Sequence, residues 1–165
     1  MAGNPHDIHY FSPFTKLRPI EVDAMLRAKL ASLMPLFEGN QTELSTDIRS
    51  VQVIANAYLL ESLLSNLLMN AIRHNVSKGM IEIFLADGIL SIRNTGPTLT
   101  KPAKILFERF IKDDASAPST GLGLAIVKEI CLQHGWWVSY TSNGVWHEVK
   151  VRFDQPPHSP GKEEA

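Results

Sequence analysis

The sequence predicts an α+β fold, a two-layer α/β sandwich in which three helices cover one face of a mixed sheet of about five strands. Three stretches place apolar residues at the helical period, and two pairs of alternating stretches flank Asp-Gly and Asn-Gly turns. The helices and strands follow one another in mixed order, which favours a mixed sheet with its helices on one side. A length of 165 residues suits one domain with a single core.

Helices are expected at residues 22–37, 56–74 and 121–134. Asn56 is a suitable N-cap for the second helix, and Gly135 is suited to end the third. The apolar residues of the second helix fall on one stripe, which should face the core. They are Leu60, Leu63, Leu64, Leu67 and Ala71.

The strand-like stretches are short, and the last four form two hairpins. They span residues 42–48, 50–54, 80–86, 89–94, 136–141 and 145–153. The hairpins turn at Asp87-Gly88 and Asn143-Gly144, dipeptides that favour tight turns. In the last strand, apolar residues alternate with charged ones, so one face is expected to be buried. These apolar residues are Val149, Val151 and Phe153.

The chain divides into a domain and two ends. Residues 1–19 contain three prolines and no sustained period, so they are interpreted as a linker or chain end. Residues 20–155 form the domain, and within it residues 97–120 are too long for a plain connector and are expected to be a mobile lid. Residues 156–165 are expected to be a disordered tail.

The composition describes a water-soluble protein, with 44% hydrophobic and 20% charged residues. The net charge of -1 argues against nucleic acid or an anionic membrane as a partner. No apolar run is long enough to span a membrane, and no signal peptide is recognisable. The single cysteine, Cys131, excludes an internal disulfide, fits a reducing cytoplasm and is expected to be a buried, unreactive thiol.

Asn66, Asn70 and Arg73 lie together on the flank of the apolar stripe of the second helix. Polar groups beside a core face are costly to place unless they have polar partners. Amide oxygens can coordinate a hard divalent cation, and a guanidinium suits phosphate oxygens. The alternative is a solvated helix flank, which the helix taken alone favours.

Asn94 ends an apolar row that contains Leu90 and Ile92. A carboxamide at the rim of an apolar slot could accept a hydrogen bond from an exocyclic amine such as that of adenine. The alternative is a simple Asn-Thr-Gly turn at the end of a strand.

The stretch 120–124, Thr-Gly-Leu-Gly-Leu, opens the third helix. Glycines allow close approach of a ligand, and the free N–H groups of a helix start attract phosphate. The stretch lacks the lysine of a P-loop, and no strand leads directly into it, which argues against a dinucleotide site. The alternative is a plain glycine-rich helix start.

Four motifs in order resemble those of sensor histidine kinases. Residues 66–75, Asn-Leu-Leu-Met-Asn-Ala-Ile-Arg-His-Asn, resemble the N box, and residues 92–96 resemble a variant of the first glycine box. Residues 106–110 match the F box closely, and residues 121–128 match the second glycine box almost letter for letter. The resemblance covers residues 20–153, and four ordered motifs are far more specific than one. The family shares the fold of the gyrase, heat-shock chaperone, kinase and mismatch-repair ATPases.

The resemblance implies binding of ATP with Mg²⁺. The ATP-binding residues that it implies are Asn66, Asn70, Arg73, His74, Asn94, Gly96, Arg109, Thr120, Gly121, Leu122, Gly123 and Leu124. Asn70 would be the metal ligand, supported by Asn66, and Arg73 would contact phosphate.

Other implied roles concern the base, the ribose and the lid. Asn94 would hold the adenine, and Gly96 would allow the turn into the lid. His74 would line the site near the ribose or phosphates, with a helix-ending surface histidine as the alternative. Arg109 would touch phosphate or the phosphoacceptor domain, with a surface salt bridge as the alternative. Phe107 and Phe110 would anchor the lid by packing.

Two positions depart from the family pattern. Asn94 stands where the family has aspartate, and Thr98 stands where it has a second glycine. Asparagine keeps the acceptor oxygen but loses the charge, and a hydrogen bond to a charged group is stronger by about 1 kcal/mol. Adenine binding is therefore expected to be retained but weaker, while Thr98 leaves the mobility of the lid open.

The resemblance implies a protein-histidine kinase that transfers the γ-phosphate to a histidine on a helical dimerisation domain. No catalytic residue is expected within this chain. His6 is interpreted as linker, because Phe11 stands where the phosphoacceptor box has proline. The alternatives are an anti-sigma-type serine kinase and a catalytically silent nucleotide-binding or scaffold module.

The expected partners are the dimerisation and phosphoacceptor domain of the same kinase and a downstream response regulator. The isolated domain is expected to be monomeric and to make no direct membrane contact. It is expected in the cytoplasm, with the parent protein anchored in the inner membrane.

Overall fold

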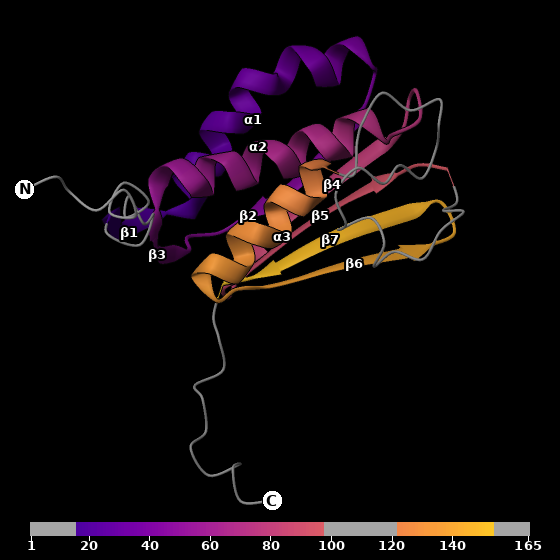
Figure 1. The fold of residues 1–165 in the computed structure, drawn as a ribbon. Helices are drawn as coiled ribbons and strands as arrows, with labels where there is room; N and C mark the ends of the chain where they lie inside the picture. Colours follow the sequence, from indigo (N-terminus) through magenta and orange to yellow (C-terminus); the bar gives the residue numbers. More distant parts are fainter. Residues whose placement is uncertain (1–15, 98–121, 154–165) are drawn as a thin grey trace, which may run out of the picture.

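The computed structural model describes residues 16–97 and 122–153, in which three helices lie against one face of a five-stranded sheet (Figure 1). The helices are α1 (Val22–Gly39), α2 (Ala57–Arg73) and α3 (Leu122–His134). The strands are β1 (Leu17–Glu21), β2 (Glu43–Ile48), β3 (Gln52–Asn56), β4 (Met80–Ala86), β5 (Ile89–Thr95), β6 (Trp137–Asn143) and β7 (Trp146–Arg152). The predicted α+β sandwich is confirmed.

The sheet is mixed, with strand order β2-β4-β5-β7-β6. β2 runs parallel to β4, and the other neighbours are antiparallel. The two predicted hairpins are β4–β5 and β6–β7, and they join through β5 and β7, where Asn94 is directly opposite His147. β1 and β3 form a separate antiparallel pair at one end of the helical layer (Figure 1).

Local sequence explains α2. The side-chain oxygen of Asn56 accepts a hydrogen bond from Leu59 N at 3.0 Å, as expected of the N-cap. The predicted apolar stripe is buried against the sheet and the other helices, because its residues recur on one face at the helical period. Its members Leu60, Leu63, Leu64, Leu67 and Ala71 are all at most 2% exposed.

The β4–β5 turn is also explained by local sequence. Asp87 and Gly88 both adopt positive φ, 53° and 75°, as a tight turn matched to the twist of the strands requires. The two strands therefore pair in a fixed register, which buries Ile81, Ile83 and Leu85 on the helix-facing side.

The prediction for residues 17–19 was wrong, because they belong to β1 rather than to a linker. Pro19 argues against a strand in the sequence, because proline donates no hydrogen bond to a neighbouring strand and is tolerated only at the edge of a sheet. Here it lies opposite Ile54 in the two-stranded pair, and the neighbouring Ile20 is buried. The third strand was also misplaced, since it covers Gln52–Asn56 rather than residues 50–54.

The buried core includes the thiol of Cys131, which is fully shielded from solvent. The expected burial is confirmed, and it raises the pKa of this thiol to about 12. In the described parts of the chain, no helix is long and apolar enough to cross a membrane. Most of the expected lid, the tail and residues 1–15 lie outside the described residues.

Candidate functional site

The polar flank of α2 meets the glycine-rich start of α3. The two helices pack against each other, and a Cβ placed on Gly123 would lie 3.5 Å from Asn66 Oδ1. Asn66 Nδ2 donates to Ser62 O at 2.7 Å and lies 3.3 Å from Ser62 Oγ, so these contacts fix the orientation of the amide. The structure thus brings together an amide and a glycine that are far apart in the sequence.

Asn70 and Arg73 lie further along the same helix. Asn70 is half-buried, and its side chain forms no hydrogen bond with the residues that the structure describes. Arg73 is exposed in the last turn of α2 and forms no ion pair within the same residues. An amide oxygen and a guanidinium are therefore both available to a ligand.

Asn75 ties the end of α2 to the sheet. Its Oδ1 accepts a hydrogen bond from Thr95 Oγ1 at 2.6 Å, and its Nδ2 donates to Met80 O at 3.0 Å. Met80 N in turn donates to Thr95 Oγ1 at 2.9 Å. These bonds hold the end of β5, and with it Asn94, in a fixed position relative to α2.

Gly96 lies close to the end of α2. A Cβ on this residue would lie 2.6 Å from the backbone oxygen of His74 and 3.1 Å from the ring of His147. Both distances are shorter than ordinary contacts, so only glycine fits here without movement. His74 caps the C-terminus of α2 and is half-buried, and its backbone lies beside Gly96.

Asn94 and His147 are buried polar residues at this end of the sheet, 5% and 4% exposed. Asn94 Nδ2 donates to Thr95 O at 2.8 Å, and its Oδ1 accepts no hydrogen bond from the described residues. His147 was not among the site residues predicted from the sequence. The available signal was its place two residues before Val149, in the buried row of the last strand.

Part of the predicted site cannot be placed. Arg109, Thr120, Gly121 and the side chain of Leu122 lie outside the described residues. The side chain of Leu124 is 3% exposed and belongs to the core, so a contact of this residue with a ligand would involve its backbone. The described residues therefore form two groups, one at the α2–α3 contact and one at the end of β5.

The donor set fits magnesium held by a nucleotide rather than a metal held by the protein alone. In residues 16–97 and 122–153, no three His, Cys, Asp or Glu side chains form a group that could hold a metal ion. Mg²⁺ is commonly bound by one or two protein oxygens together with substrate phosphates and waters. An amide oxygen from Asn70 is compatible with that arrangement.

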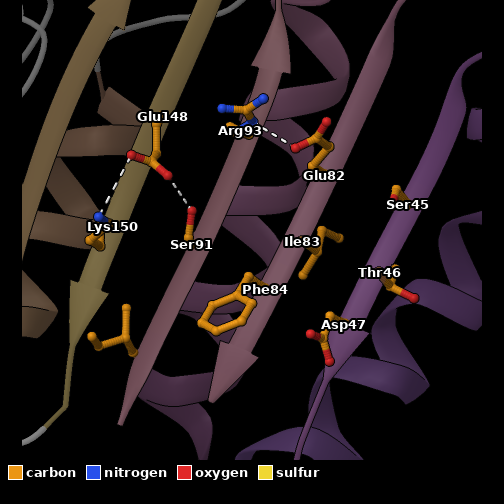
Figure 2. A pocket seen from close by; sticks show the side chains of 11 residues that line it. Ser45, Thr46, Asp47, Glu82, Ile83, Phe84, Ser91, Arg93, Glu148 and Lys150 are labelled. Carbon is orange, nitrogen blue, oxygen red and sulfur yellow. Dashed lines mark hydrogen bonds and ion pairs between the residues drawn. The ribbon is translucent and has the colours of Figure 1, made fainter. Parts of the chain in front are cut away.

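A separate hollow of about 420 Å³ lies on the opposite face of the sheet, with the helices behind the strands (Figure 2). Its charged groups are paired, mostly with one another, and Asp47 Oδ1 lies 3.4 Å from Arg49 Nε. Arg93 Nε is 2.7 Å from Glu82 Oε2, and Glu148 accepts a hydrogen bond from Ser91 at 2.5 Å. Lys150 Nζ is 3.9 Å from Glu148. This hollow was not predicted from the sequence, and its paired charges leave few groups free to bind a ligand.

Comparison with known proteins identifies the class. The profile of the histidine kinase-, DNA gyrase B- and HSP90-like ATPases matches residues 55–157, and the chain belongs to this family. The resemblance inferred from the four motifs is therefore confirmed, and the chain is an ATPase domain of the histidine kinase type.

Individual relatives agree with this assignment. The chain is similar to the heme sensor protein HssS of Staphylococcus aureus strain JH9, with 33% identity over 129 residues. The match covers 75% of this chain and 28% of HssS, so the chain spans under a third of that relative. HssS of strain Newman is 38% identical over 102 residues, which cover 59% of this chain and 22% of that protein.

Solved structures share the fold. The catalytic domain of histidine kinase ThkA superposes with a TM-score of 0.69 at 20% identity, covering 83% of this chain and 94% of that one. The mycobacterial sensor histidine kinase MprB gives a TM-score of 0.67 at 27% identity, covering 81% and 95%.

Proposed function

We propose that this chain is the ATP-binding catalytic domain of a two-component sensor histidine kinase. It binds ATP with Mg²⁺ and transfers the γ-phosphate to a histidine of a helical dimerisation domain. The observation that carries this proposal is the position of Gly123 beside Asn66, where an added Cβ would lie 3.5 Å from the amide oxygen, so that the amide row of α2 faces the start of α3. Family membership and the unpaired Asn94 oxygen support it.

The phosphates bind between α2 and α3. Asn70 contributes an oxygen to Mg²⁺, with Asn66 supporting it, and Arg73 contacts phosphate oxygens. The backbone N–H groups of the glycine-rich stretch 120–124, whose role follows from the family motif, attract the negative charge of the triphosphate. Gly123 leaves room for it beside Asn66, and the family motifs assign Gly121 the same role and Arg109 a contact with phosphate.

The adenine binds at the end of β5. Asn94 Oδ1 accepts a hydrogen bond from the exocyclic amine, since its own amide nitrogen already donates to Thr95 O. Gly96 allows the chain to pass close to α2, and His74 lies beside it at the helix end. The Asn75–Thr95 hydrogen bond keeps this end of the site aligned with the phosphate end.

The chemistry consists of positioning and charge neutralisation. An imidazole nitrogen of the partner domain forms a bond to the γ-phosphorus, the bond from that phosphorus to the β–γ bridging oxygen breaks, and ADP leaves with that electron pair. Mg²⁺ bound with the nucleotide would supply positive charge against the phosphate oxygens. The residues of this chain bind and orient the nucleotide, and the nucleophile comes from the other domain.

The whole protein is proposed to signal through a response regulator. The histidine kinase ThkA, which shares the fold, has been solved in complex with the response regulator protein TrrA. The domain is proposed to act in the cytoplasm, where ATP is available and the free thiol of Cys131 stays reduced.

The test is titration with ATP and Mg²⁺, followed by phosphotransfer to a supplied dimerisation domain. Asn70→Ala is expected to abolish transfer, while Asn40→Ala, an exposed asparagine at the end of α1, should behave as wild type. Equal activity of Asn70→Ala and wild type would refute the metal assignment. An acid-labile, alkali-stable product indicates phosphohistidine, whereas an acid-stable product would indicate the serine kinase alternative. ATP binding without transfer would favour the silent module.

A further inference from the structure

His147 is a buried side chain with an unused ring nitrogen. It lies on β7 in the helix-facing row that continues through Val149 and Val151, and it is 4% exposed. Its Nδ1 is 3.1 Å from the Tyr140 hydroxyl, whereas its Nε2 is buried and has no hydrogen-bond partner in the described parts of the chain. Burying a polar group without a partner is unfavourable, so such a group calls for a ligand or another explanation.

The position of the ring places this nitrogen at the adenine end of the proposed site. His147 is directly opposite Asn94 in the β5–β7 register, so both side chains stand on the same face of the sheet as neighbours. A Cβ on Gly96 would lie 3.3 Å from His147 Nε2. The unused nitrogen therefore lies beside two residues that the proposed function assigns to the nucleotide.

The hydrogen bond at Nδ1 defines what Nε2 can do. When the Tyr140 hydroxyl donates to Nδ1, the neutral imidazole carries its proton on Nε2, which is then a donor. Asn94 Oδ1 is an acceptor, so the two neighbouring side chains present one acceptor and one donor. Adenine is complementary to this pair, since its amino group donates and the adjacent ring nitrogen accepts. Guanine places a carbonyl oxygen where adenine has its amine, which would face the Asn94 oxygen.

We infer that His147 is a specificity-determining residue, and that with Asn94 it selects adenine over guanine. Nε2–H donates to the ring nitrogen beside the amino group, directly or through one bound water. Nε2 is buried in this structure, so the base reaches it through a small shift of the Gly96 backbone that lies beside it. The inference rests on the proposed nucleotide site.

The experiment compares the affinities of wild type and His147→Phe for ATP and GTP, both with Mg²⁺. Phenylalanine keeps the ring packing and removes both nitrogens, so the ATP affinity should fall about fivefold with little change for GTP. His147→Gln, which retains an amide donor, should recover part of the selectivity. Tyr140→Phe should lower the selectivity for ATP over GTP, because the tautomer of His147 is no longer fixed by a hydrogen bond at Nδ1. Thermal unfolding of His147→Phe should occur at or above the wild-type temperature, because an unpaired buried polar atom is removed.

Two outcomes would overturn the inference while leaving the proposed function intact. One is that neither affinity changes in His147→Phe, and the other is that the ATP and GTP affinities fall by the same factor; in both cases the ATP-to-GTP ratio is unchanged. A second test uses 1-deaza-ATP and 7-deaza-ATP, in each of which carbon replaces one ring nitrogen near the amino group. The analogue that lacks the nitrogen bound by His147 should bind wild type more weakly than ATP does, but should bind His147→Phe as well as ATP does. If neither analogue does so, the donor role is refuted. Failure of wild type to bind ATP at all would instead refute the proposed function.

Discussion

Replacing Gly96 by alanine tests the close contact between α2 and the end of β5. The added Cβ would lie 2.6 Å from the backbone oxygen of His74, below the 3.0 Å that real Cβ contacts respect. This oxygen belongs to the helix cap and cannot swing away as a side chain could. The backbone of Gly96 does not adopt positive φ, so the predicted effect is steric rather than conformational.

The magnitude follows from the shift that the clash demands. The end of α2 and the end of β5 must move apart by several tenths of an ångström, against the hydrogen bonds of Asn75 to Thr95 and Met80. Overpacking of this kind lowers the free energy of unfolding by about 1–3 kcal/mol. Because Asn94 moves with β5, the affinity for ATP should fall as well.

Urea unfolding of Gly96→Ala and Gly39→Ala gives the comparison. Gly39 is the last residue of α1, and nothing lies within 4 Å of its added Cβ, so alanine there should be neutral or stabilising by up to about 1 kcal/mol. The two substitutions add the same methyl group and differ in what it meets. If Gly96→Ala unfolds at the same urea concentration as Gly39→Ala, the steric argument is wrong.

Three further predictions concern single groups. Burial alone would raise the pKa of Asp23, but hydrogen bonds from Val51 N and from Arg27 lower it below its ordinary 3.8. The ionised carboxylate therefore stabilises the fold above about pH 4, and this contribution disappears as the pH falls through the lowered pKa. Asp23→Asn should therefore lower the free energy of unfolding by up to about 1 kcal/mol at pH 7 and leave it unchanged at pH 2, as measured by urea unfolding at both pH values. The Cys131 thiol, with its pKa raised to about 12, should react with a thiol reagent at pH 8 far more slowly in the native protein than in urea, and equal rates would contradict its burial. Asn94→Asp should bind ATP about fivefold more tightly in calorimetry, since the acceptor becomes charged, and weaker binding would mean that desolvation of the carboxylate dominates.

Local patterns predicted most of the secondary structure. The stripe of α2, its Asn56 cap and the Asp87-Gly88 turn depend on residues within a few positions of one another, so the sequence records them directly. The motifs that identify the family are equally local, and they indicated the amide row, the strand-end carboxamide and the glycine-rich helix start. Gly123 beside Asn66 agrees with the convergence that those motifs implied.

β1 was not predicted from the sequence, because its stability comes from pairing with β3. A five-residue strand with a central proline has no alternation of its own, and pairing with β3 is what orders it. His147 was not predicted as a site residue for a similar reason, since a lone histidine shows no ligand spacing in the sequence. Its interest arises from Asn94 across the ladder and Gly96 beside its ring.

Periodicity, capping and turn chemistry act over a few residues, and for that reason the amino-acid order alone specified the helices, the hairpins and the family. Cross-strand register and helix-to-strand contact join residues dozens of positions apart, and they depend on how all the elements pack at once. The parallel pairing of β2 with β4, the 2.6 Å constraint at Gly96 and the unpaired nitrogen of His147 are of this second kind. These features exist only in the folded chain, since burial and proximity are properties of the packed molecule.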